Sequence, residues 1–312
     1  ILEKLRDIYS DYRNVYNSDL FDKSDCDKLY IDDSVLSKIL LDLRKPVGRI
    51  PYDFKSIESD ILGKVYENFI GHVQTGKKRF REKEDIGKRK REGIYYTPKY
   101  IVDYIVNNTI RELVKNKSIE EIMRIKILDP ACGSGSFLLK VFDVLVEESE
   151  KNKKQKLTYE EKKQLMLNCI YGVDLDERAV SIAKLNLSLK MAEKDEKLPM
   201  LGENIRLGNS LIDNKDIAGY KAFVWKEEFK DIMDNGGFDV VIGNPPYGAD
   251  LSDNEKKWLD NRYKLKNTDT AVLFMSLAKE LLRKGGINGF IIPKSFVYSA
   301  GWKDIRKELL NG

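Results

Sequence analysis

The chain has 312 residues, of which 42% are hydrophobic, and a formal net charge of +4. This length favours two domains, and this composition is sufficient for an ordinary packed core. No stretch approaches the roughly 18 consecutive apolar residues of a membrane span, and the start of the chain lacks the order of a signal peptide. We therefore expect a soluble, cytoplasmic protein. The small net charge does not by itself indicate a nucleic-acid partner.

Cysteine and histidine are scarce in this chain. The three cysteines are Cys26, Cys132 and Cys169, and the one histidine is His72. The cysteines are too few and too far apart for a disulfide framework, and with His72 they form no metal-ligand spacing. We interpret the cysteines as reduced thiols and His72 as a structural or surface residue, and we expect no bound metal.

The first part of the chain has apolar residues at helical spacing, as in DSVLSKILLDLRK and DILGKVYENFIGHV. This pattern predicts an α-helical domain over residues 1–92. Near its end, the run KKRFREKEDIGKRKR at residues 77–91 has a large excess of Lys and Arg over acidic residues. Such a run either attracts DNA phosphates by releasing counterions or is a solvated linker.

The remaining residues, 93–312, have the pattern of a different domain. At its start Thr97 suits a helix N-cap and Pro98 suits the first helical position. Beyond Ile125, strand-like apolar runs alternate with helical patterns, and the last of these helices is expected to continue through LLRKGG. The predicted strands are IKILDP, CIYGVDLD, NIRLGNSLI, FDVVIGNPP and INGFIIP. This alternation predicts an α/β domain whose parallel sheet is covered by helices on both faces.

Four polar residues, Asp129, Asp174, Asn209 and Asn244, stand at the ends of predicted strands. Helical crossovers between parallel strands place these ends along one edge of the sheet, so we expect the four residues to lie together. The charged segment at residues 147–164 has no predicted function.

The turn DPACGSGSF at residues 129–137 follows the first predicted strand. Its Gly133 and Gly135 permit positive φ angles, so a ligand can lie close to the backbone above the start of a helix. Asp174 comes 41 residues after Gly133. The dinucleotide-binding fingerprint has an acidic residue after roughly 20 residues, which argues against a nicotinamide cofactor. With Asp174 suited to ribose hydroxyls and Asn209 to an adenine edge, the strand ends predict a site for an adenosine-bearing ligand.

The fourth predicted strand is followed by Asn244-Pro245-Pro246-Tyr247. The two proline rings fix successive φ angles and make the loop rigid. The Asn244 side-chain oxygen and the Pro245 carbonyl are then two fixed acceptors, which suit an amino group with two hydrogens. An exocyclic amine held in this way is a better nucleophile, because its lone pair is drawn out of conjugation. Tyr247 offers a stacking face for the ring that carries the amine.

These motifs together resemble a known family. NPPY at residues 244–247, with DPACGSG at 129–135, resembles the N6-adenine DNA methyltransferases that use S-adenosylmethionine. The order of YYTP at 95–98, the glycine turn and NPPY is similar to their gamma class. LGKVYENFIG at 62–71, followed by the basic run, resembles the helical connector of type IIG restriction-modification enzymes. The resemblance implies a Rossmann-like methyltransferase fold preceded by an α-helical domain.

The resemblance also implies roles for individual residues. Those expected to bind S-adenosylmethionine are Tyr95, Thr97, Asp129, Ala131, Cys132, Gly133, Gly135, Asp174, Leu175, Asn209 and Ser210. Asn244, Pro245, Pro246 and Tyr247 would form the catalytic loop, with Tyr247 stacked on an adenine flipped out of duplex DNA. Trp302 is expected on the other face of that base, with Phe296 as the alternative. Lys294 and Lys303 are candidate phosphate contacts.

The implied reaction is methyl transfer from S-adenosylmethionine to the adenine N6 amine, without a metal or a covalent nucleophile. Two alternatives remain open. One is a methyltransferase of a glutamine side-chain amide or an RNA base, and the other is a non-catalytic DNA-binding subunit of a defence complex.

The chain has no initial Met and ends soon after WKDIRKELL. We therefore expect it to be part of a longer polypeptide that also contains the last strands of the sheet and a target-recognition domain. The chain lacks the nuclease pattern of Pro-Asp followed by Glu-x-Lys, and we interpret the triplet EFK at residues 228–230 as a surface helix. Any nuclease activity is expected in another part of that polypeptide. The DNA recognition sequence and the oligomeric state do not follow from the sequence.

Overall fold

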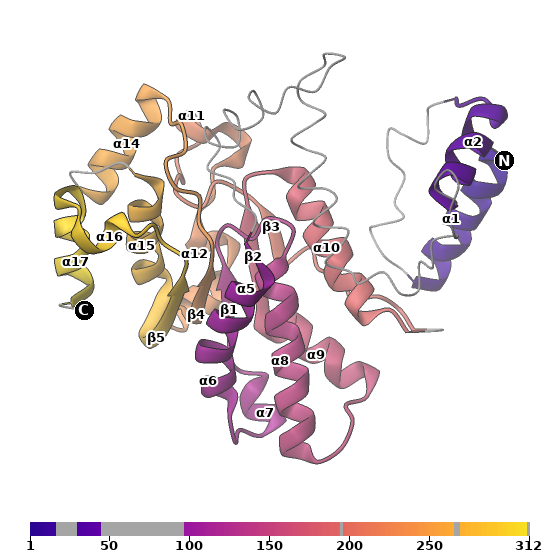
Figure 1. The fold of residues 1–312 in the computed structure, drawn as a ribbon, viewed down its shortest axis with the longest axis horizontal. Coiled ribbons are helices and arrows are strands. Elements are labelled where there is room, and N and C mark those ends of the chain that lie inside the picture. The colour runs from indigo at the N-terminus through magenta and orange to yellow at the C-terminus, as the bar shows by residue number, and fades with distance from the viewer. Residues whose placement is uncertain (17–29, 45–96, 194–195, 265–268, 311–312) are drawn as a thin grey trace.

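The computed structural model describes residues 1–16, 30–44, 97–193, 196–264 and 269–310 (Figure 1). Most of the predicted helical domain lies outside these residues, and so do the basic run, His72 and Tyr95. In the first part of the chain, the described elements are the helices α1 (Leu2–Tyr16) and α2 (Asp33–Arg44). The domain boundary at residue 92 stays a prediction.

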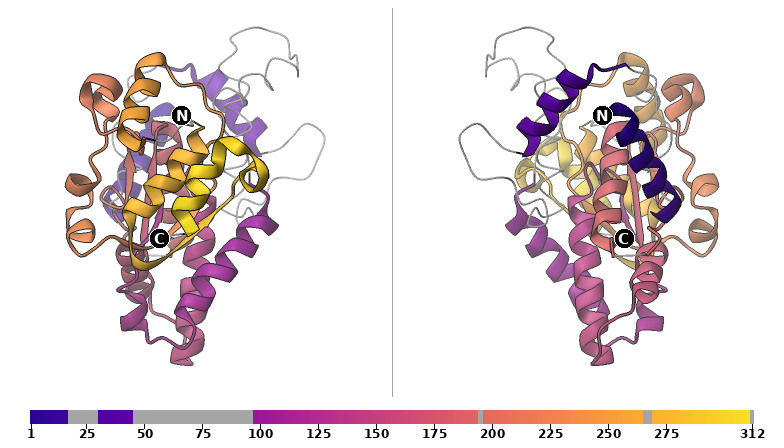
Figure 2. Two further views of the ribbon diagram at one scale, coloured as in Figure 1. Left: turned by 90° about the vertical axis from the view of Figure 1, so that its left-hand side faces the viewer. Right: turned by 90° about the vertical axis from the view of Figure 1, so that its right-hand side faces the viewer.

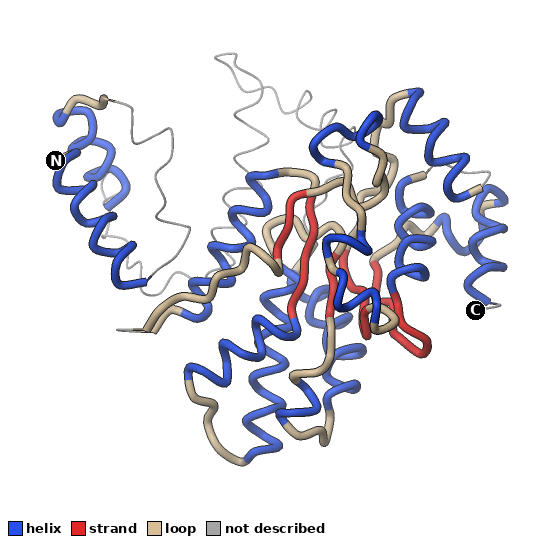
Figure 3. The backbone as a smooth tube through the Cα atoms, turned by 180° about the vertical axis from the view of Figure 1, so that it is seen from behind, coloured by secondary structure: helices blue, strands red, loops and turns tan. Residues whose placement is uncertain are grey.

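Five parallel strands form one sheet in the order β3-β2-β1-β4-β5 (Figure 3). The strands are β1 (Ile127–Asp129), β2 (Ile170–Asp174), β3 (Ile205–Leu207), β4 (Phe238–Gly243) and β5 (Leu282–Phe290). From the central β1 the chain first builds one half of the sheet and then crosses to β4 to build the other. The strand order therefore reverses between β1 and β4, which is where open α/β sheets bind ligands. The predicted α/β class is confirmed.

Helices cover both faces of the sheet (Figures 1 and 2). The helices of the first face are α5 (Lys99–Val106), α7 (Ile119–Ile122), α8 (Ser136–Lys153), α9 (Tyr159–Cys169) and α10 (Glu177–Met191). Those of the second face are α12 (Trp225–Glu228), α13 (Lys230–Asp234), α14 (Asp253–Tyr263) and α15 (Thr270–Leu281). Because successive strand residues point to opposite faces, Ile127 packs in the first layer and Leu128 in the second.

Short helices complete the described part of the chain. They are α11 (Lys215–Ala218), η5 (Gly219–Lys221), α16 (Ser295–Tyr298), η6 (Ala300–Trp302) and α17 (Lys303–Leu310). The last three follow β5 and pack on α15 through a separate hydrophobic cluster. None of the described helices has both the length and the apolar character that crossing a membrane requires.

The helix before β5 ends earlier than the sequence predicts. α15 ends at Leu281 and the strand begins at the next residue, so LRKGG belongs to β5 rather than to a helix. The pairing of β4 with β5 shifts between the Phe238–Leu282 pair and the Val240–Ile287 pair. Gly285, with a φ of +78°, lies in this irregular part of the strand. The glycines therefore accommodate extra strand residues and do not end the helix.

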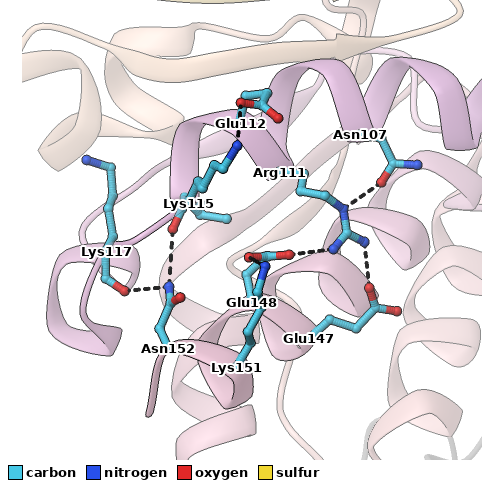
Figure 4. A network of polar contacts seen from close by, with 10 residues as sticks. Asn107, Arg111, Glu112, Lys115, Lys117, Glu147, Glu148, Lys151 and Asn152 are labelled. Atoms are coloured by element: carbon cyan, nitrogen blue, oxygen red, sulfur yellow. Dashed lines mark hydrogen bonds and ion pairs between the residues drawn. The ribbon is translucent and has the colours of Figure 1, made fainter. Parts of the chain in front are cut away.

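A π-helical turn, η4 (Asn107–Arg111), joins α5 to α6 (Glu112–Val114). From this turn Arg111 donates hydrogen bonds of 2.5 Å to Glu147 and Glu148 of α8 (Figure 4). The Glu148 side chain is only 3% exposed, whereas that of Glu147 is 54% exposed. The guanidinium group of Arg111 therefore supplies the charge that a buried carboxylate requires.

We expect Arg111→Met to lower the free energy of unfolding by roughly 3 kcal/mol, because the buried Glu148 carboxylate loses its main partner. Glu147→Gln is the matched control, and it should cost less than about 1 kcal/mol because this ion pair is largely solvated. Urea unfolding of the two variants beside the unchanged protein measures both values. Equal losses in the two variants would show that burial of Glu148 does not control the strength of the network.

Candidate functional site

The polar residues predicted at the strand ends lie along the carboxyl edge of the sheet. β1 ends at Asp129 and β2 at Asp174, and Asn244 directly follows β4. Asn209 lies two residues beyond β3, where it forms a bridge with Ala222. The expected proximity of these strand ends is therefore observed.

The glycine turn after β1 is tied to the neighbouring strand β2. The backbone N–H of Gly133 donates to Asp174 Oδ2 at 2.8 Å, and that of Cys132 donates to the Val173 carbonyl at 3.0 Å. Gly133 has a φ of +53°, which favours glycine. A Cβ atom at Gly133 would meet no atom within 4 Å, so this side of the turn is open to a ligand. At Gly135 a Cβ atom would lie 3.2 Å from that of Ala183, because the turn packs closely on α10.

Two acidic side chains lie beside this turn. The Asp129 carboxyl is 1% exposed and accepts a hydrogen bond from the Ala131 N–H at 3.0 Å. Burial raises the pKa of Asp129 to about 8, and the nearby Asp174 adds to the rise. Burial also raises the pKa of Asp174, opposed by hydrogen bonds from the N–H groups of Asp176 and Gly133. A cationic ligand at this edge would stabilise both carboxylates in their charged forms.

Leu175, Asn209 and Ser210 lie beyond β2 and β3. The Leu175 side chain is 50% exposed and offers an apolar surface next to Asp174. Asn209 Oδ1 accepts from the Leu211 N–H at 3.1 Å. Ser210 is buried, and its hydroxyl donates to the Pro130 carbonyl at 2.6 Å. In this structure the Ser210 hydroxyl therefore holds the glycine turn, and its predicted contact with a cofactor stays a prediction.

The loop after β4 contacts the start of α5. Asn244 Nδ2 donates to Thr97 Oγ1 at 3.1 Å, so these two residues meet although they are far apart in sequence. The predicted helix cap at Thr97 is wrong. α5 begins at Lys99, and Pro98 occupies the cap position without a side-chain hydrogen bond. The Thr97 hydroxyl accepts a hydrogen bond from the loop instead.

The base of the same loop lies against β1. A Cβ atom at Gly243 would be 2.5 Å from Asp129 Oδ1, so the close approach of the two strand ends requires a glycine there. Farther along, the Thr270 hydroxyl donates to the Pro246 carbonyl at 2.7 Å. The loop is therefore adjacent to the acidic residue of the glycine turn and is bonded to the first residue of α15.

The predicted base-stacking residues lie near one another. Tyr247, Phe296 and Trp302 all contact the hydrophobic cluster between α15 and the C-terminal helices. Trp302 is only 5% exposed, and the Phe296 ring meets it edge-on with centroids 5.8 Å apart. Trp302 would have to leave this cluster to stack on a base, whereas Phe296 is already partly exposed. Lys294 and Lys303 are both exposed.

Sequence reasoning missed Asn186 and Thr270, two buried polar residues that hold the loops from neighbouring elements, and for Ser210 it predicted a cofactor contact and not a bond to the turn. Asn186 of α10 is fully buried and donates to the Ser134 carbonyl at 3.0 Å. Ser210 and Thr270 hold Pro130 and Pro246 in the same manner. The only available signal was a polar residue inside an apolar pattern, which does not identify the partner.

Comparison with known proteins gives two matches to family models. Residues 168–312 match the family described as Eco57I restriction-modification methylase, and residues 123–199 match the RMKL-like methyltransferase domain. The chain is 33% identical to the type II restriction enzyme and methyltransferase RM.Eco57I of Escherichia coli, over 94% of this chain and 32% of that protein. It is 26% identical to the putative type II restriction enzyme and methyltransferase RM.MjaORFECS2P of Methanocaldococcus jannaschii, over 81% of this chain and 35% of that protein. The chain thus spans about a third of these curated relatives.

Solved structures share the fold. A complex of DrdV with DNA has a TM-score of 0.57 and 19% identity, covering 99% of this chain and 32% of that one. The type IIL restriction-modification enzyme MmeI in complex with DNA has a TM-score of 0.59 and 15% identity, covering 99% of this chain and 44% of that one. At these identities the similarity shows the fold alone.

The raised pKa of Asp129 predicts a pH-dependent stability. Its carboxyl stays protonated in the folded protein up to about pH 8, whereas in the unfolded chain it ionises near its ordinary pKa of about 3.9. Between these values the folded state binds the extra proton, so the free energy of unfolding should fall as the pH rises, by up to about 1.4 kcal/mol per pH unit.

Asp129→Asn keeps the shape of the side chain and removes this titration. Urea unfolding of both proteins between pH 5 and pH 9 should show that the unchanged protein loses stability relative to the variant until about pH 8. Above that pH the difference should level off. Parallel pH profiles would mean that the Asp129 carboxyl is charged in the folded protein.

Proposed function

We propose that this chain, whose residues 168–312 match the Eco57I restriction-modification methylase family, methylates the N6 amine of adenine in DNA with S-adenosylmethionine as the methyl donor. The observation that carries the proposal is the meeting of two loops at neighbouring strands. The glycine turn follows β1, the Asn244-Pro245-Pro246-Tyr247 loop follows β4, and these strands are paired. A cofactor on the first loop would lie next to a target held by the second.

The residues of the glycine turn fit S-adenosylmethionine. The open side of Gly133 leaves room for a ligand against the backbone, and the acidic pair Asp129 and Asp174 complements a positive charge. Asp174 would accept hydrogen bonds from the ribose, with Asn209 near the adenine and Leu175 in apolar contact. The residues Ala131, Cys132, Gly135 and Ser210 would shape the same site. When bound, the cofactor supplies an electrophilic methyl group on a sulfonium centre.

The second loop would hold and prepare the target amine. The Asn244 side-chain oxygen and the Pro245 carbonyl would each accept one of its hydrogens, which localises the lone pair on the nitrogen. Pro246 keeps the loop rigid. Tyr247 would stack on the flipped adenine and so help to offset the few kcal/mol that unstacking costs. The chain's contribution to the rate is therefore positioning and polarisation of the amine.

DNA as the substrate is supported by the relatives, which are named restriction enzyme and methyltransferase. We further assign residues 1–92 to a helical connector and residues 93–312 to the methyltransferase domain. Phe296, Trp302 and Lys294 would face the DNA. Because the matched part of RM.Eco57I is 32% of that protein, reading of the DNA sequence and any cleavage are assigned to other domains of the full-length protein.

Asn244→Ala should reduce methyl transfer by about 100-fold or more, because the amine loses an acceptor that acts on the reacting nitrogen. Binding of S-adenosylmethionine should stay largely unchanged. The measurement uses the full-length natural protein, labelled cofactor and DNA from a host without adenine methylation, followed by analysis of the nucleosides. Asn235→Ala, in an exposed turn after α13, is the matched control.

Label in N6-methyladenine, lost in Asn244→Ala and kept in Asn235→Ala, is the expected outcome. Near-normal transfer by Asn244→Ala would contradict the assignment of the loop. Label that enters protein or RNA instead of DNA would favour one of the alternative substrates of the Asn-Pro-Pro-Tyr loop.

The cofactor site is tested separately by calorimetric titration with S-adenosylmethionine. Asp174→Ala should weaken binding by about tenfold or more, because both a charged acceptor and the tie to Gly133 are lost. Asp176→Ser keeps an oxygen that can cap α10 and should bind normally. Equal affinities for all three proteins would place the cofactor elsewhere.

A further inference from the structure

We propose that Thr97 and Thr270 are positioning residues that fix the Asn244–Tyr247 loop from two sides in the shape that methyl transfer requires. This inference rests on the proposed function of the loop. It adds roles for two hydroxyl groups, neither of which has to touch the target base.

The loop has few means of fixing itself. Two of its four residues are prolines, which have no backbone N–H to donate within the loop. Their carbonyls still require donors if they are to be held in one place, and such donors have to come from other parts of the chain. The φ angles of the prolines stiffen the loop internally but do not attach it to the domain.

Thr270 attaches the second half of the loop. It is 2% exposed and is the first residue of α15. Its hydroxyl donates to the Pro246 carbonyl at 2.7 Å, and it accepts a longer bond of 3.5 Å from the Ala249 N–H. The hydroxyl therefore bridges the two ends of the bend that contains Tyr247. The Pro246 carbonyl already accepts this bond from Thr270, which favours the Pro245 carbonyl as the one that would receive the target amine.

The helix that carries Thr270, α15, is capped and well packed, so the position of Thr270 is fixed. Asp269 caps it by accepting from the Ala271 N–H at 3.0 Å. Ala271 and Val272 are buried in the hydrophobic cluster that also contains Trp302. A shift of Thr270 would therefore require α15 to repack, which close-packed interiors resist.

Thr97 attaches the first half of the loop. Its hydroxyl oxygen, 8% exposed, accepts from Asn244 Nδ2 at 3.1 Å. Because the amide is planar, fixing its nitrogen also fixes the direction of its oxygen, which is the proposed acceptor of the target amine. Thr97 lies next to Pro98, the cap residue of α5, and Val102 and Val106 of this helix are buried against the sheet.

The two threonines come from opposite layers of the domain. α5 packs in the first helical layer, with Ile127 and Val240, whereas Leu273 of α15 packs in the second. The two proposed acceptors, on Asn244 and Pro245, thus lie between attachment points on both faces of the sheet. Loss of either attachment would misplace the acceptors without removing them.

Matched variants separate the hydroxyl from the rest of each side chain. Thr97→Val and Thr270→Val remove the hydroxyl, whereas Thr97→Ser and Thr270→Ser keep it. Ser276→Ala is the control for α15, because the Ser276 hydroxyl is buried without a hydrogen-bond partner among the described residues. Thr109→Val is the control for the α5 segment, because among the described residues its hydroxyl donates to the Ile105 carbonyl of the preceding turn.

The first readout is the single-turnover rate of methyl transfer by the full-length protein at saturating S-adenosylmethionine, together with the affinity for this cofactor. Each valine variant should lower the rate by about tenfold or more, because small misplacements of reacting groups are costly. The cofactor affinity should be unchanged. The serine variants should recover most of the rate, and the two controls should match the unchanged protein.

The second readout does not depend on activity. Amide hydrogen exchange of the segment 244–252 should become faster in both valine variants and stay unchanged in the serine variants and controls. Unchanged exchange or an unchanged rate in the valine variants would overturn the proposal. So would equal losses in the serine variants, which would assign the effect to packing.

Thr97 has a specific alternative role, because the family resemblance implies that this residue binds the cofactor. If Thr97→Val weakened only the cofactor affinity, with a normal rate at saturation, its assignment to Asn244 would be overturned. If the unchanged full-length protein transferred no methyl group to DNA, the proposed function would fail, and hydrogen exchange would still decide whether the threonines hold the loop.

Discussion

The carboxyl edge of the sheet depends on one constraint, which is that the buried carbonyls of irregular backbone need hydrogen-bond donors. Within the sheet the neighbouring strands supply these donors, but beyond the strand ends the ladder stops. Here side chains from other elements replace it, and the pairs are Ser210 with Pro130, Asn186 with Ser134 and Thr270 with Pro246. Both loops are thereby joined to well-packed helices and strands, and the site has a rigid frame.

The same burial determines the electrostatics of this edge. Asp129 is enclosed by its own turn and by the close approach of Gly243, so its pKa is raised to about 8. A bound cation stabilises the charged form of such a carboxyl strongly, because their interaction takes place away from bulk water. With β4 paired directly to β1, the loop proposed to hold the target lies beside this carboxyl. The architecture therefore suits a reaction between a cationic methyl donor and a neutral amine.

The succession of strands and helices along the chain and the position of each motif at a strand end were predicted from the sequence, since both follow from local patterns and from the geometry of parallel sheets. The order of the strands within the sheet came from the structure. Two local predictions were wrong for tertiary reasons. Thr97 contacts Asn244 instead of capping α5. Residues 282–286, which were expected to continue the preceding helix, belong to β5 because this strand pairs with β4. Whether Trp302 or Phe296 meets the target base stays a prediction, and only Phe296 is partly exposed in this structure.

By itself, the sequence determined the alternation of strands and helices, the rigid Asn-Pro-Pro-Tyr loop, the glycine turn and their order along the chain. These features depend on residue type and spacing, which are local properties. Only the tertiary structure decided that Thr97 meets Asn244, that Thr270 meets Pro246 and that Asp129 is buried against Gly243. Hydrogen-bond partners distant in sequence and the pKa of a buried acid depend on how elements pack, and no spacing in the sequence encodes that packing directly.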